Sequence, residues 1–370
     1  MLRFLFFPVF LLILFGMQLY LATWVLRFFP GLPIPPRAMV LAAALIAASV
    51  PLSFFWVRRG GLGAWTFAYL TCLWLGISFI WFTWALCGDC FALAARLAGA
   101  GEGMRSATAW GVLIVTGLMC FLAFWTASGP PKVRNIELPL AHLPKELDGF
   151  SIVQLSDVHL GVTERLPRFE RLADQVVALG PDLVVMTGDF LDPGFHEDKA
   201  AAVIGKRIHG KRGTLAVLGN HEFYHGEEAS SEFFKALDAR LLRNEIVELP
   251  GGLQVAGVDD IRTEGVTREQ LSDLLSRLDP KRPSVLLSHQ PLMFDAAAER
   301  GVGLMLSGHT HRGQIFPFGF LVRLFYPRFY GLYRKGDTSL YVTAGAGYWG
   351  PPMRLFAPPE IARFVLRSTP

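Results

Sequence analysis

The first third of the chain is dominated by long, uninterrupted runs of apolar residues. Four such segments occupy residues 4–26, 38–57, 63–87 and 107–127, and none of them contains a charged side chain. A helix needs about 20 apolar residues to cross ~30 Å of hydrocarbon, so each segment is long enough. We therefore predict an N-terminal α-helical transmembrane bundle of about four spans in residues 1–130. A cleaved signal peptide would explain only the first segment, whose apolar run is longer than such peptides carry.

The rest of the chain, residues 131–370, follows a Gly-Pro-Pro break and alternates short apolar runs with amphipathic stretches. The amphipathic stretches predict helices at 165–179, 227–240, 267–278 and 293–300. The apolar runs predict strands at 150–155, 183–186, 215–218, 253–258, 285–287, 304–306 and 340–342. Because these runs do not alternate with polar residues, we expect the strands to be buried on both faces. The pattern predicts a second domain of α/β class over residues 131–370.

Charge is divided unevenly between the two parts. Seven of the 35 Lys and Arg residues and two of the 31 acidic residues precede residue 131, which leaves 28 basic and 29 acidic residues in the second domain. Nucleic-acid-binding domains carry a basic excess, so we expect no nucleic-acid partner. The apolar segments lack the ionisable groups that mark a transport path, which favours an anchor over a transporter. Basic residues beside the spans, five against four, favour a cytoplasmic second domain.

Metal-ligand residue types follow five of the predicted strands. Ligands bind beyond the carboxyl ends of strands in open α/β sheets, so these residues are expected to converge. In each of two Asp/His-x-His pairs the side chains, if extended, lie on one face and can address one centre or two adjacent centres. Carboxylate, imidazole and amide ligands without a thiolate suit Mn²⁺, Fe or Zn²⁺. The residues are Asp157, His159, Asp189, Asn220, His221, His289, His309 and His311.

These blocks together resemble the signature of the calcineurin-like metallophosphoesterases. The resemblance covers about residues 148–368, and one position departs from the family pattern, where Ser288 replaces a glycine. The order of GHTHRGQ, an aromatic loop and GAGYWGPPMRLFAPPEI is similar to a membrane-associated bacterial branch, which implies the bacterial inner membrane. The matching blocks are Asp157-Val-His159, Gly188-Asp189-Phe-Leu-Asp192, Gly219-Asn220-His221-Glu222, Ser288-His289 and Gly308-His309-Thr310-His311.

The resemblance implies a four-layer αββα sandwich of two mixed sheets between helices, with two divalent metal ions. Manganese is the metal we expect first, with iron or zinc as alternatives. His221 would lie near the leaving-group oxygen without binding metal, and Asp192 would orient it. Asp189 would bridge the two metals. One metal would be held by Asp157, His159, Asp189 and His311, and the other by Asp189, Asn220, His289 and His309.

Such a site suits phosphoester chemistry, because two cations ~3.5–4 Å apart clamp both the attacking and the leaving oxygen of an in-line displacement. We predict a metal-dependent phosphoesterase: a membrane-anchored two-metal phosphohydrolase in which metal-bound hydroxide attacks a phosphodiester or pyrophosphate bond. Related membrane-associated members suggest a lipid-borne substrate such as UDP-2,3-diacylglucosamine. One alternative is a phosphodiesterase for soluble nucleotides that is merely tethered to the membrane. Another is a non-catalytic membrane scaffold, which would be expected to have lost ligands.

Two further segments have more than one interpretation. Residues 316–333 carry eight aromatic side chains together with Arg323 and Arg328. This segment is either a loop packed on the sheet edge or an interfacial surface that contacts lipid or substrate. The stretch from Gly345 to Gly350 matches a dinucleotide fingerprint, but prolines rather than a helix follow it, so we expect a glycine-rich loop near the metals.

Overall fold

The structure is a computed structural model of the chain. It describes residues 2–29, 31–99, 101, 103–196 and 198–368, with the side chains of 2–7 and 198 outside the description. The outer limits of the two predicted domains, residues 1 and 370, therefore lie outside the described residues. The chain divides into two compact units. The first runs to Thr126 and also takes in Gly350–Leu355, and the second holds Ala127–Trp349 and the C-terminal segment from Phe356.

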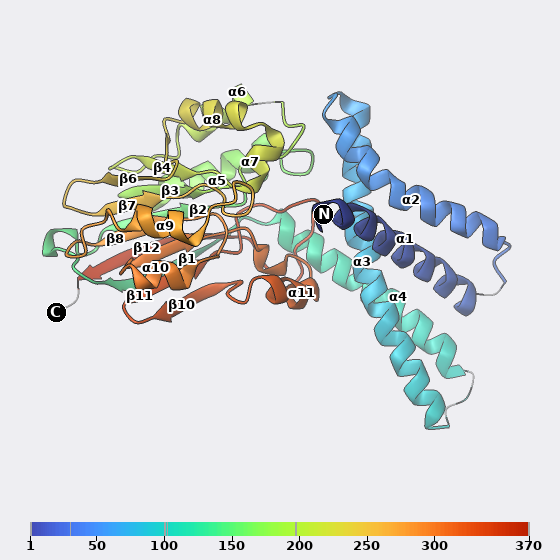
Figure 1. Cartoon of the computed structure of the whole chain (residues 1–370). Helices are drawn as coiled ribbons and strands as arrows, with labels where there is room; N and C mark the ends of the chain where they lie inside the picture. Colours follow the sequence, from blue (N-terminus) through green and yellow to red (C-terminus); the bar gives the residue numbers. More distant parts are fainter. Residues whose placement is uncertain (1, 30, 100, 102, 197, 369–370) are drawn as a thin grey trace. The chain divides into compact units, whose positions relative to one another are not determined.

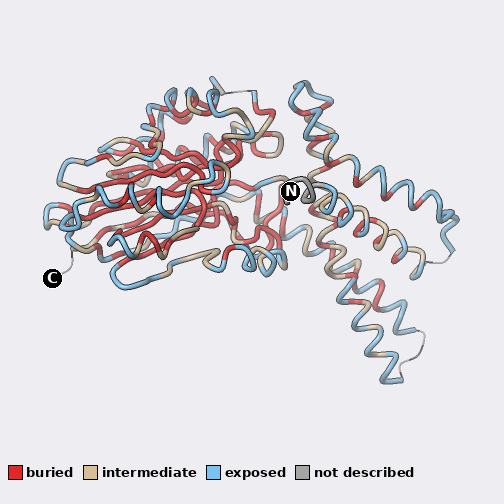
Figure 2. The backbone as a smooth tube through the Cα atoms, viewed as in Figure 1, coloured by how far each residue is buried: buried red, intermediate tan, exposed pale blue. Residues whose placement is uncertain are grey.

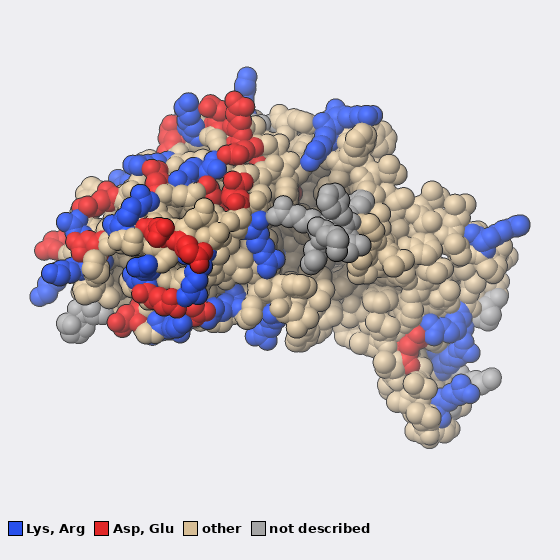
Figure 3. All heavy atoms as spheres, viewed as in Figure 1, with Lys and Arg blue, Asp and Glu red and all other residues tan. Residues whose placement is uncertain are grey.

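The first unit is built from four long helices, at the positions that the apolar segments predict. They are α1 (Leu2–Phe28), α2 (Pro36–Val57), α3 (Leu62–Leu97) and α4 (Gly103–Ser128). All four are long and apolar enough to cross a membrane. Figure 3 shows a mostly uncharged surface on these helices, with charged side chains gathered near their ends. This distribution matches a hydrocarbon layer between two polar interfaces.

Charged groups also occur within the helical unit, at positions outside the four predicted apolar segments. α3 has 36 residues and continues past its predicted end to Asp89, whose carboxylate lies 2.9 Å from Arg27 and accepts a hydrogen bond from Tyr20 at 2.7 Å. Arg354, from the returning Gly350–Leu355 segment, is fully buried. Its backbone N–H donates to the carbonyl of Ala123 at 2.8 Å. The hydropathy pattern did not reveal these groups. Asp89 lies beyond the end of the third apolar segment, and Arg354 comes from a part of the sequence far from all four segments.

The second unit contains two six-stranded mixed sheets (Figure 1). The first sheet has the order β1-β12-β2-β3-β4-β5 and the second has β10-β11-β9-β8-β7-β6. In the first sheet, the neighbouring strands β2, β3, β4 and β5 run parallel to one another. In the second sheet, the neighbouring strands β11, β9, β8 and β7 do the same. The strands are β1 (Lys132–Leu140), β2 (Ser151–Leu155), β3 (Leu183–Thr187), β4 (Thr214–Val217), β5 (Arg240–Leu241), β6 (Glu245–Glu248), β7 (Gln254–Gly257), β8 (Ser284–Leu287), β9 (Leu304–Ser307), β10 (Gly331–Lys335), β11 (Thr338–Val342) and β12 (Glu360–Ser368).

Helices cover the outer faces of both sheets. The first sheet packs against α5 (Leu166–Leu179), α6 (Asp198–Gly205) and α8 (Glu227–Ala236). The second sheet packs against α9 (Arg268–Leu275) and α10 (Phe294–Glu299). A third apolar core fills the space between the sheets, where Val185 and Val217 of one meet Val255 and Leu287 of the other. Figure 2 shows the strands buried along most of their length. The predicted αββα sandwich is confirmed.

All seven strands and four helices predicted for this unit are present, with ends shifted by a few residues. The strands β1, β5, β6, β10 and β12 were not predicted from the sequence. Neither were α6, the short helix α7 (Asn220–His225), α11 (Phe318–Phe325) and the 3₁₀ turns Lys145–Leu147 and His311–Gly313. Most of the missed strands lie at sheet edges or carry charged residues, so they lack the continuous apolar run that marked the others.

Candidate metal centre and active site

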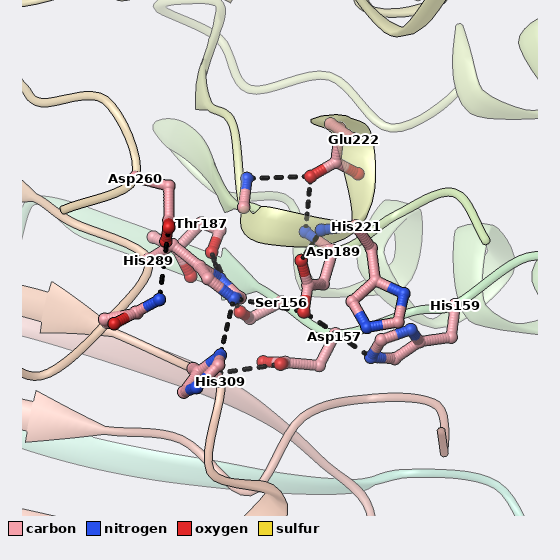
Figure 4. A network of polar contacts seen from close by, with 12 residues as sticks. Ser156, Asp157, His159, Thr187, Asp189, His221, Glu222, Asp260, His289 and His309 are labelled. Carbon is pink, nitrogen blue, oxygen red and sulfur yellow. Dashed lines mark hydrogen bonds and ion pairs between the residues drawn. The ribbon is translucent and has the colours of Figure 1, made fainter. Parts of the chain in front are cut away.

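The residues that follow five strand ends converge on one place in the second unit. Asp157 follows β2 and Asp189 follows β3, while Asn220 and His221 open α7 directly after β4. From the other sheet, His289 follows β8, and the His309–His311 turn follows β9. Almost all of these side chains are buried. Figure 4 shows Asp157, Asp189, His221, His289 and His309 gathered in one place. The convergence expected from the strand ends is therefore found.

One cluster of nitrogen and oxygen atoms is formed by Asp157, His159 and His311. The Nε2 atoms of His159 and His311 lie 2.9 Å apart, and His311 Nε2 is 3.4 Å from Asp157 Oδ1. His159 Nδ1 lies 2.8 Å from Asp192 Oδ1. An ionised carboxylate only accepts hydrogen bonds, so Nδ1 carries the proton and a neutral His159 presents a bare Nε2. That lone pair faces another imidazole nitrogen, an arrangement that a cation between them would satisfy.

A second cluster is formed by Asp189, His289 and His309. His289 Nδ1 is 2.8 Å from the carbonyl oxygen of Thr187, which fixes its proton on that side. His289 Nε2 then lies 3.1 Å from Asp189 Oδ2 and 3.2 Å from His309 Nδ1. Burial lowers the pKa of His289, but the nearby carboxylates of Asp189 and Asp157 outweigh it and raise that pKa well above its usual value. Of the two imidazoles, His289 thus favours positive charge, whereas burial and the neighbouring His289 lower the pKa of His309 to about 3.

Asp189 lies between the two clusters. Its Oδ2 atom is 3.8 Å from His159 Nε2 in one cluster and 3.1 Å from His289 Nε2 in the other. Asp157 Oδ2 and Asn220 Oδ1 are buried oxygens without a hydrogen-bond partner among the described residues. Buried polar atoms normally have partners. Imidazole nitrogens that lie close together, with unpartnered oxygens among the same residues, fit the donor set of a pair of divalent cations.

Backbone conformation contributes to this convergence in a way that the sequence did not indicate. Asp157, His159, Asp189, His309 and His311 all adopt left-handed conformations, with φ between 49° and 71°. For residues other than glycine this conformation costs roughly 1–2 kcal/mol each and clusters at functional sites. The assumption of extended Asp157-x-His159 and His309-x-His311 pairs is therefore wrong. The chain turns sharply at each of these five residues, and the second pair divides between the two clusters.

Glycines in the same loops let their backbones approach closely. A Cβ atom at Gly188, which has φ of 85°, would lie 2.5 Å from the backbone nitrogen of Gly219. At Gly308 it would lie 2.2 Å from Asp157 Oδ2. The loop from Gly345 also packs on Asp157, since a Cβ atom there would approach the Asp157 Cβ to 2.7 Å. The glycine-rich stretch thus lies beside the clusters, where the sequence analysis expected it.

His221 lies at the edge of the first cluster, beside Asp192. Its Nδ1 atom is 2.7 Å from Asp192 Oδ1, although the angle is not that of a hydrogen bond. Burial lowers the pKa of His221, but Asp189 and Asp192 outweigh it and raise the pKa to about 9. His221, His159 and Asp189 also form a group close enough to hold a cation. The structure therefore brings His221 to the site. Its position is compatible with either of two roles, donating a proton or binding a metal.

Glu222 is a structural residue of the site to which the sequence analysis assigned no role. Its side chain is fully buried and accepts four backbone hydrogen bonds. The donors are the N–H groups of Asp189 at 2.8 Å, Phe190 at 2.6 Å, Leu191 at 3.1 Å and Gly219 at 2.7 Å. One carboxylate thus ties the loop after β3 to the loop after β4. The glutamate in the Gly-Asn-His-Glu block was the available sequence signal.

We expect Glu222→Gln to destabilise the fold. Glutamine has one acceptor oxygen, so two of the four N–H groups would face an amide that cannot accept, at ~1–3 kcal/mol each. For a domain of this size, that corresponds to a Tm lower by roughly 5–20 °C. Thermal unfolding of the full chain in detergent measures the shift. Glu228→Gln, at an exposed carboxylate in the first turn of α8, is the matched control and should leave Tm unchanged. Equal Tm values for both variants would contradict the assigned role.

Tyr326 is a second residue that the sequence analysis missed. It follows α11 and is buried, and its hydroxyl lies 2.8 Å from His309 Nε2 and 3.4 Å from Gln290 Oε1. Gln290 in turn donates to Asp260 at 3.1 Å. Which of the two groups donates in the contact between Tyr326 and His309 depends on the tautomer of His309. No sequence signal distinguishes this inward tyrosine from the other aromatic residues of 316–333.

Comparison with known proteins agrees with this geometry. The family model for calcineurin-like phosphoesterases matches residues 150–313. An uncharacterised metallophosphoesterase of Helicobacter pylori is 37% identical over 243 residues, which are 65% of this chain and 65% of that protein. A Danio rerio transmembrane protein with a metallophosphoesterase domain is 33% identical, over 69% of this chain and 62% of its own length.

An uncharacterised metallophosphoesterase of Bacillus subtilis is 34% identical over 72% of this chain and 96% of its own length. The chain thus spans less than two thirds of the length of the first two relatives and nearly all of the third. The similarity falls on the unit that carries the converging ligand-type residues. This chain belongs to the calcineurin-like metallophosphoesterase family.

Proposed function

We propose that the protein is a membrane-anchored, two-metal phosphohydrolase that cleaves a phosphodiester or pyrophosphate bond. The observation that carries the proposal is the pair of clusters in which imidazole nitrogens lie against one another and against the carboxylate of Asp189. In this proposal residues 1–130 anchor the enzyme and residues 131–370 form its catalytic domain. The four membrane-length helices and the relative named as a transmembrane protein support the anchor.

In this proposal the two clusters hold two divalent cations. When bound, they supply Lewis-acid stabilisation of the phosphoryl oxygens and a water acidified to near neutrality. The mixture of imidazole, carboxylate and amide donors favours manganese, with iron or zinc as alternatives. Asp189 lies between the clusters and is the shared ligand. One site comprises Asp157, His159, Asp189 and His311, and the other comprises Asp189, Asn220, His289 and His309.

His221 has the role of proton donor to the departing oxygen. Its pKa of about 9 leaves the imidazole protonated at neutral pH. Such donation is typically worth ~10²–10⁴ in rate. Asp192 acts on two histidines through the same oxygen, which lies 2.8 Å from His159 Nδ1 and 2.7 Å from His221 Nδ1. Asp192 therefore orients a metal ligand as well as the proton donor, whereas the sequence analysis gave it only the second role.

We propose a lipid-borne substrate, such as UDP-2,3-diacylglucosamine, and a catalytic domain on the cytoplasmic side of a bacterial inner membrane. The membrane-length helices support a substrate that lies in the bilayer. The exposed aromatic residues close to Tyr326 and His309 support the same choice. The second candidate is a phosphodiesterase for soluble nucleotides, which the family assignment supports equally.

A comparison of substrates tests the proposal. The full chain in detergent micelles would be stripped of metal, reloaded with Mn²⁺, and assayed on bis-(p-nitrophenyl) phosphate, cyclic nucleotides and UDP-2,3-diacylglucosamine. We expect metal-dependent hydrolysis, fastest on the lipid. Hydrolysis of the soluble esters alone would overturn the lipid substrate and favour the nucleotide alternative. Failure to hydrolyse any of them in the metal-loaded protein would overturn the enzyme assignment.

A further inference from the structure

α11 exposes an unusual amount of apolar surface for a helix beside an active site. None of its eight residues is buried, and Figure 2 draws it as a mostly exposed segment. Leu324 and Phe320 are 75% and 64% exposed. Exposed apolar patches of this kind mark interaction sites. A loop packed on the sheet edge, one interpretation of the sequence, would have buried these side chains. The exposed apolar face consists of Phe316, Phe318, Phe320, Leu321, Leu324 and Phe325.

Cationic side chains accompany this apolar face. Arg323 lies over the ring of Phe329 at 4.8 Å, and Arg312 lies over the ring of Tyr330 at 4.3 Å. Within the part of the chain that the structure describes, neither arginine forms an ion pair with an acidic residue. Arginine beside exposed aromatic and leucine side chains suits the boundary between acyl chains and anionic headgroups.

The helix is fixed to the loop that carries the ligand-type histidines. A Cβ atom on Gly313 would lie 2.3 Å from the Cα of Gly319, so the loop and the start of α11 are in direct contact. Beyond the C-terminal end of α11, the carbonyl of Phe329 accepts a hydrogen bond from the hydroxyl of Thr310 at 2.6 Å. Tyr326, the residue after α11, contacts His309. Whatever surface α11 contacts is therefore brought next to the candidate metal centre.

The chain itself indicates which surface that is. Its four membrane-length helices place it at a bilayer, and only residues 129–131 separate the end of α4 at Ser128 from the start of β1 at Lys132. Four backbone steps reach at most about 14 Å. The first strand of the second unit is therefore tethered by a short connection to a membrane-length helix. For a chain tethered in this way, a lipid surface is an available partner for an exposed apolar helix.

We infer that α11 docks into the bilayer interface and so holds the candidate metal centre, through Tyr326 and His309, beside lipid phosphate groups. The docking itself rests on the exposed face of α11, whereas the benefit to a lipid substrate rests on the proposed function. The partner is an anionic phospholipid bilayer, not a second protein and not a soluble ligand.

A fluorescent label at position 324 tests the docking in the full chain. The four cysteines would be replaced by alanine, and Leu324→Cys would be labelled with an environment-sensitive fluorophore in Mn²⁺-loaded protein. The protein would be placed in discs of phosphatidylethanolamine and phosphatidylglycerol, with or without brominated acyl chains. We expect the bromine atoms on the acyl chains to quench the fluorescence of the label at position 324, and iodide added to the water to leave it unquenched. Val203→Cys on α6 is the matched control, because Val203 is similarly exposed at 71%, and its label should show the reverse.

Two results would overturn the inference. A label at 324 that iodide quenches and bromine does not would show that α11 lies in water, and a label shielded from both quenchers would show that protein covers it. Adding Phe320→Glu to the labelled protein should abolish the bromine quenching while metal content reports an intact fold. Hydrolysis of bis-(p-nitrophenyl) phosphate by the unlabelled chain separates the two proposals. An active enzyme with a water-exposed α11 defeats only the docking, and an inactive protein with a docked α11 defeats only the proposed function.

Discussion

Asp189→Asn is expected to abolish metal binding at the centre and, with it, phosphoesterase activity. A carboxylate oxygen of Asp189 lies within 4 Å of imidazole nitrogens in both clusters, at 3.8 Å from His159 and 3.1 Å from His289. Its pKa lies well below the usual value, since the attraction of His289 and His221 outweighs the effect of burial. Asparagine removes that charge. Outer-shell substitutions cost ~10–100-fold in metal affinity, so a shared ligand should cost more than about 100-fold.

Metal analysis of the purified full chain after removal of free metal measures this loss, beside the rate on bis-(p-nitrophenyl) phosphate. Asp174→Asn makes the same chemical change on α5, where Asp174 pairs with Arg207 at the surface, and should keep metal and rate. Circular dichroism of the Asp189 variant establishes that the fold persists. A full complement of metal in folded Asp189→Asn would contradict the bridging role.

His221→Ala is expected to keep its metals and lose most turnover. In the proposed role His221 donates a proton to the departing oxygen, so its removal should lower kcat by ~10²–10⁴. The loss should be greater for substrates with poor leaving groups, because an activated phenolate departs without a proton. Rates on an aryl and an alkyl phosphodiester, measured with metal content, separate the two cases.

The structure makes this experiment decisive, because His221 also lies in a group with His159 and Asp189 that is able to hold a cation. A metal-depleted His221→Ala protein would show that His221 is a ligand and would remove the proton-donor assignment. His209→Ala, at an exposed histidine outside the site, is the matched control and should retain both metal and rate.

Prediction of the fold succeeded where burial was complete. Strands such as β3 and β8 are buried on both faces, so their apolar runs are continuous in the sequence. β1 and β12 were missed for a different reason. β1 is an exposed edge strand with charged residues, and β12 lies between β1 and β2 although its sequence is more than 190 residues from both. Pairing at that distance leaves no local signal, since only assembly of the sheet brings the partners together.

Prediction of the site succeeded for residue identity and failed for geometry. The ligand-type residues at strand ends were recognisable because parallel strands deliver their carboxyl ends to one edge. Their left-handed conformations could not be predicted, because the backbone dihedral angles at Asp157 or His309 depend on the loops that surround them. The role of Tyr326 was also invisible, since its seven aromatic neighbours in 316–333 share its composition.

Four features can be read from the amino-acid sequence alone: the two-part organisation, the α/β class of the second unit, the family resemblance and the residues that converge at the strand ends. Apolar run length and ligand-type spacing are local properties, so they are readable without coordinates. The tertiary structure alone decided which atoms face one another. It placed Asp189 between the clusters, aligned Asp192 with two histidines, and left α11 exposed beside Tyr326. Asp189 and His289 meet only when the two sheets pack together, and Asp192 meets His159 and His221 only when the neighbouring strands of the first sheet pair.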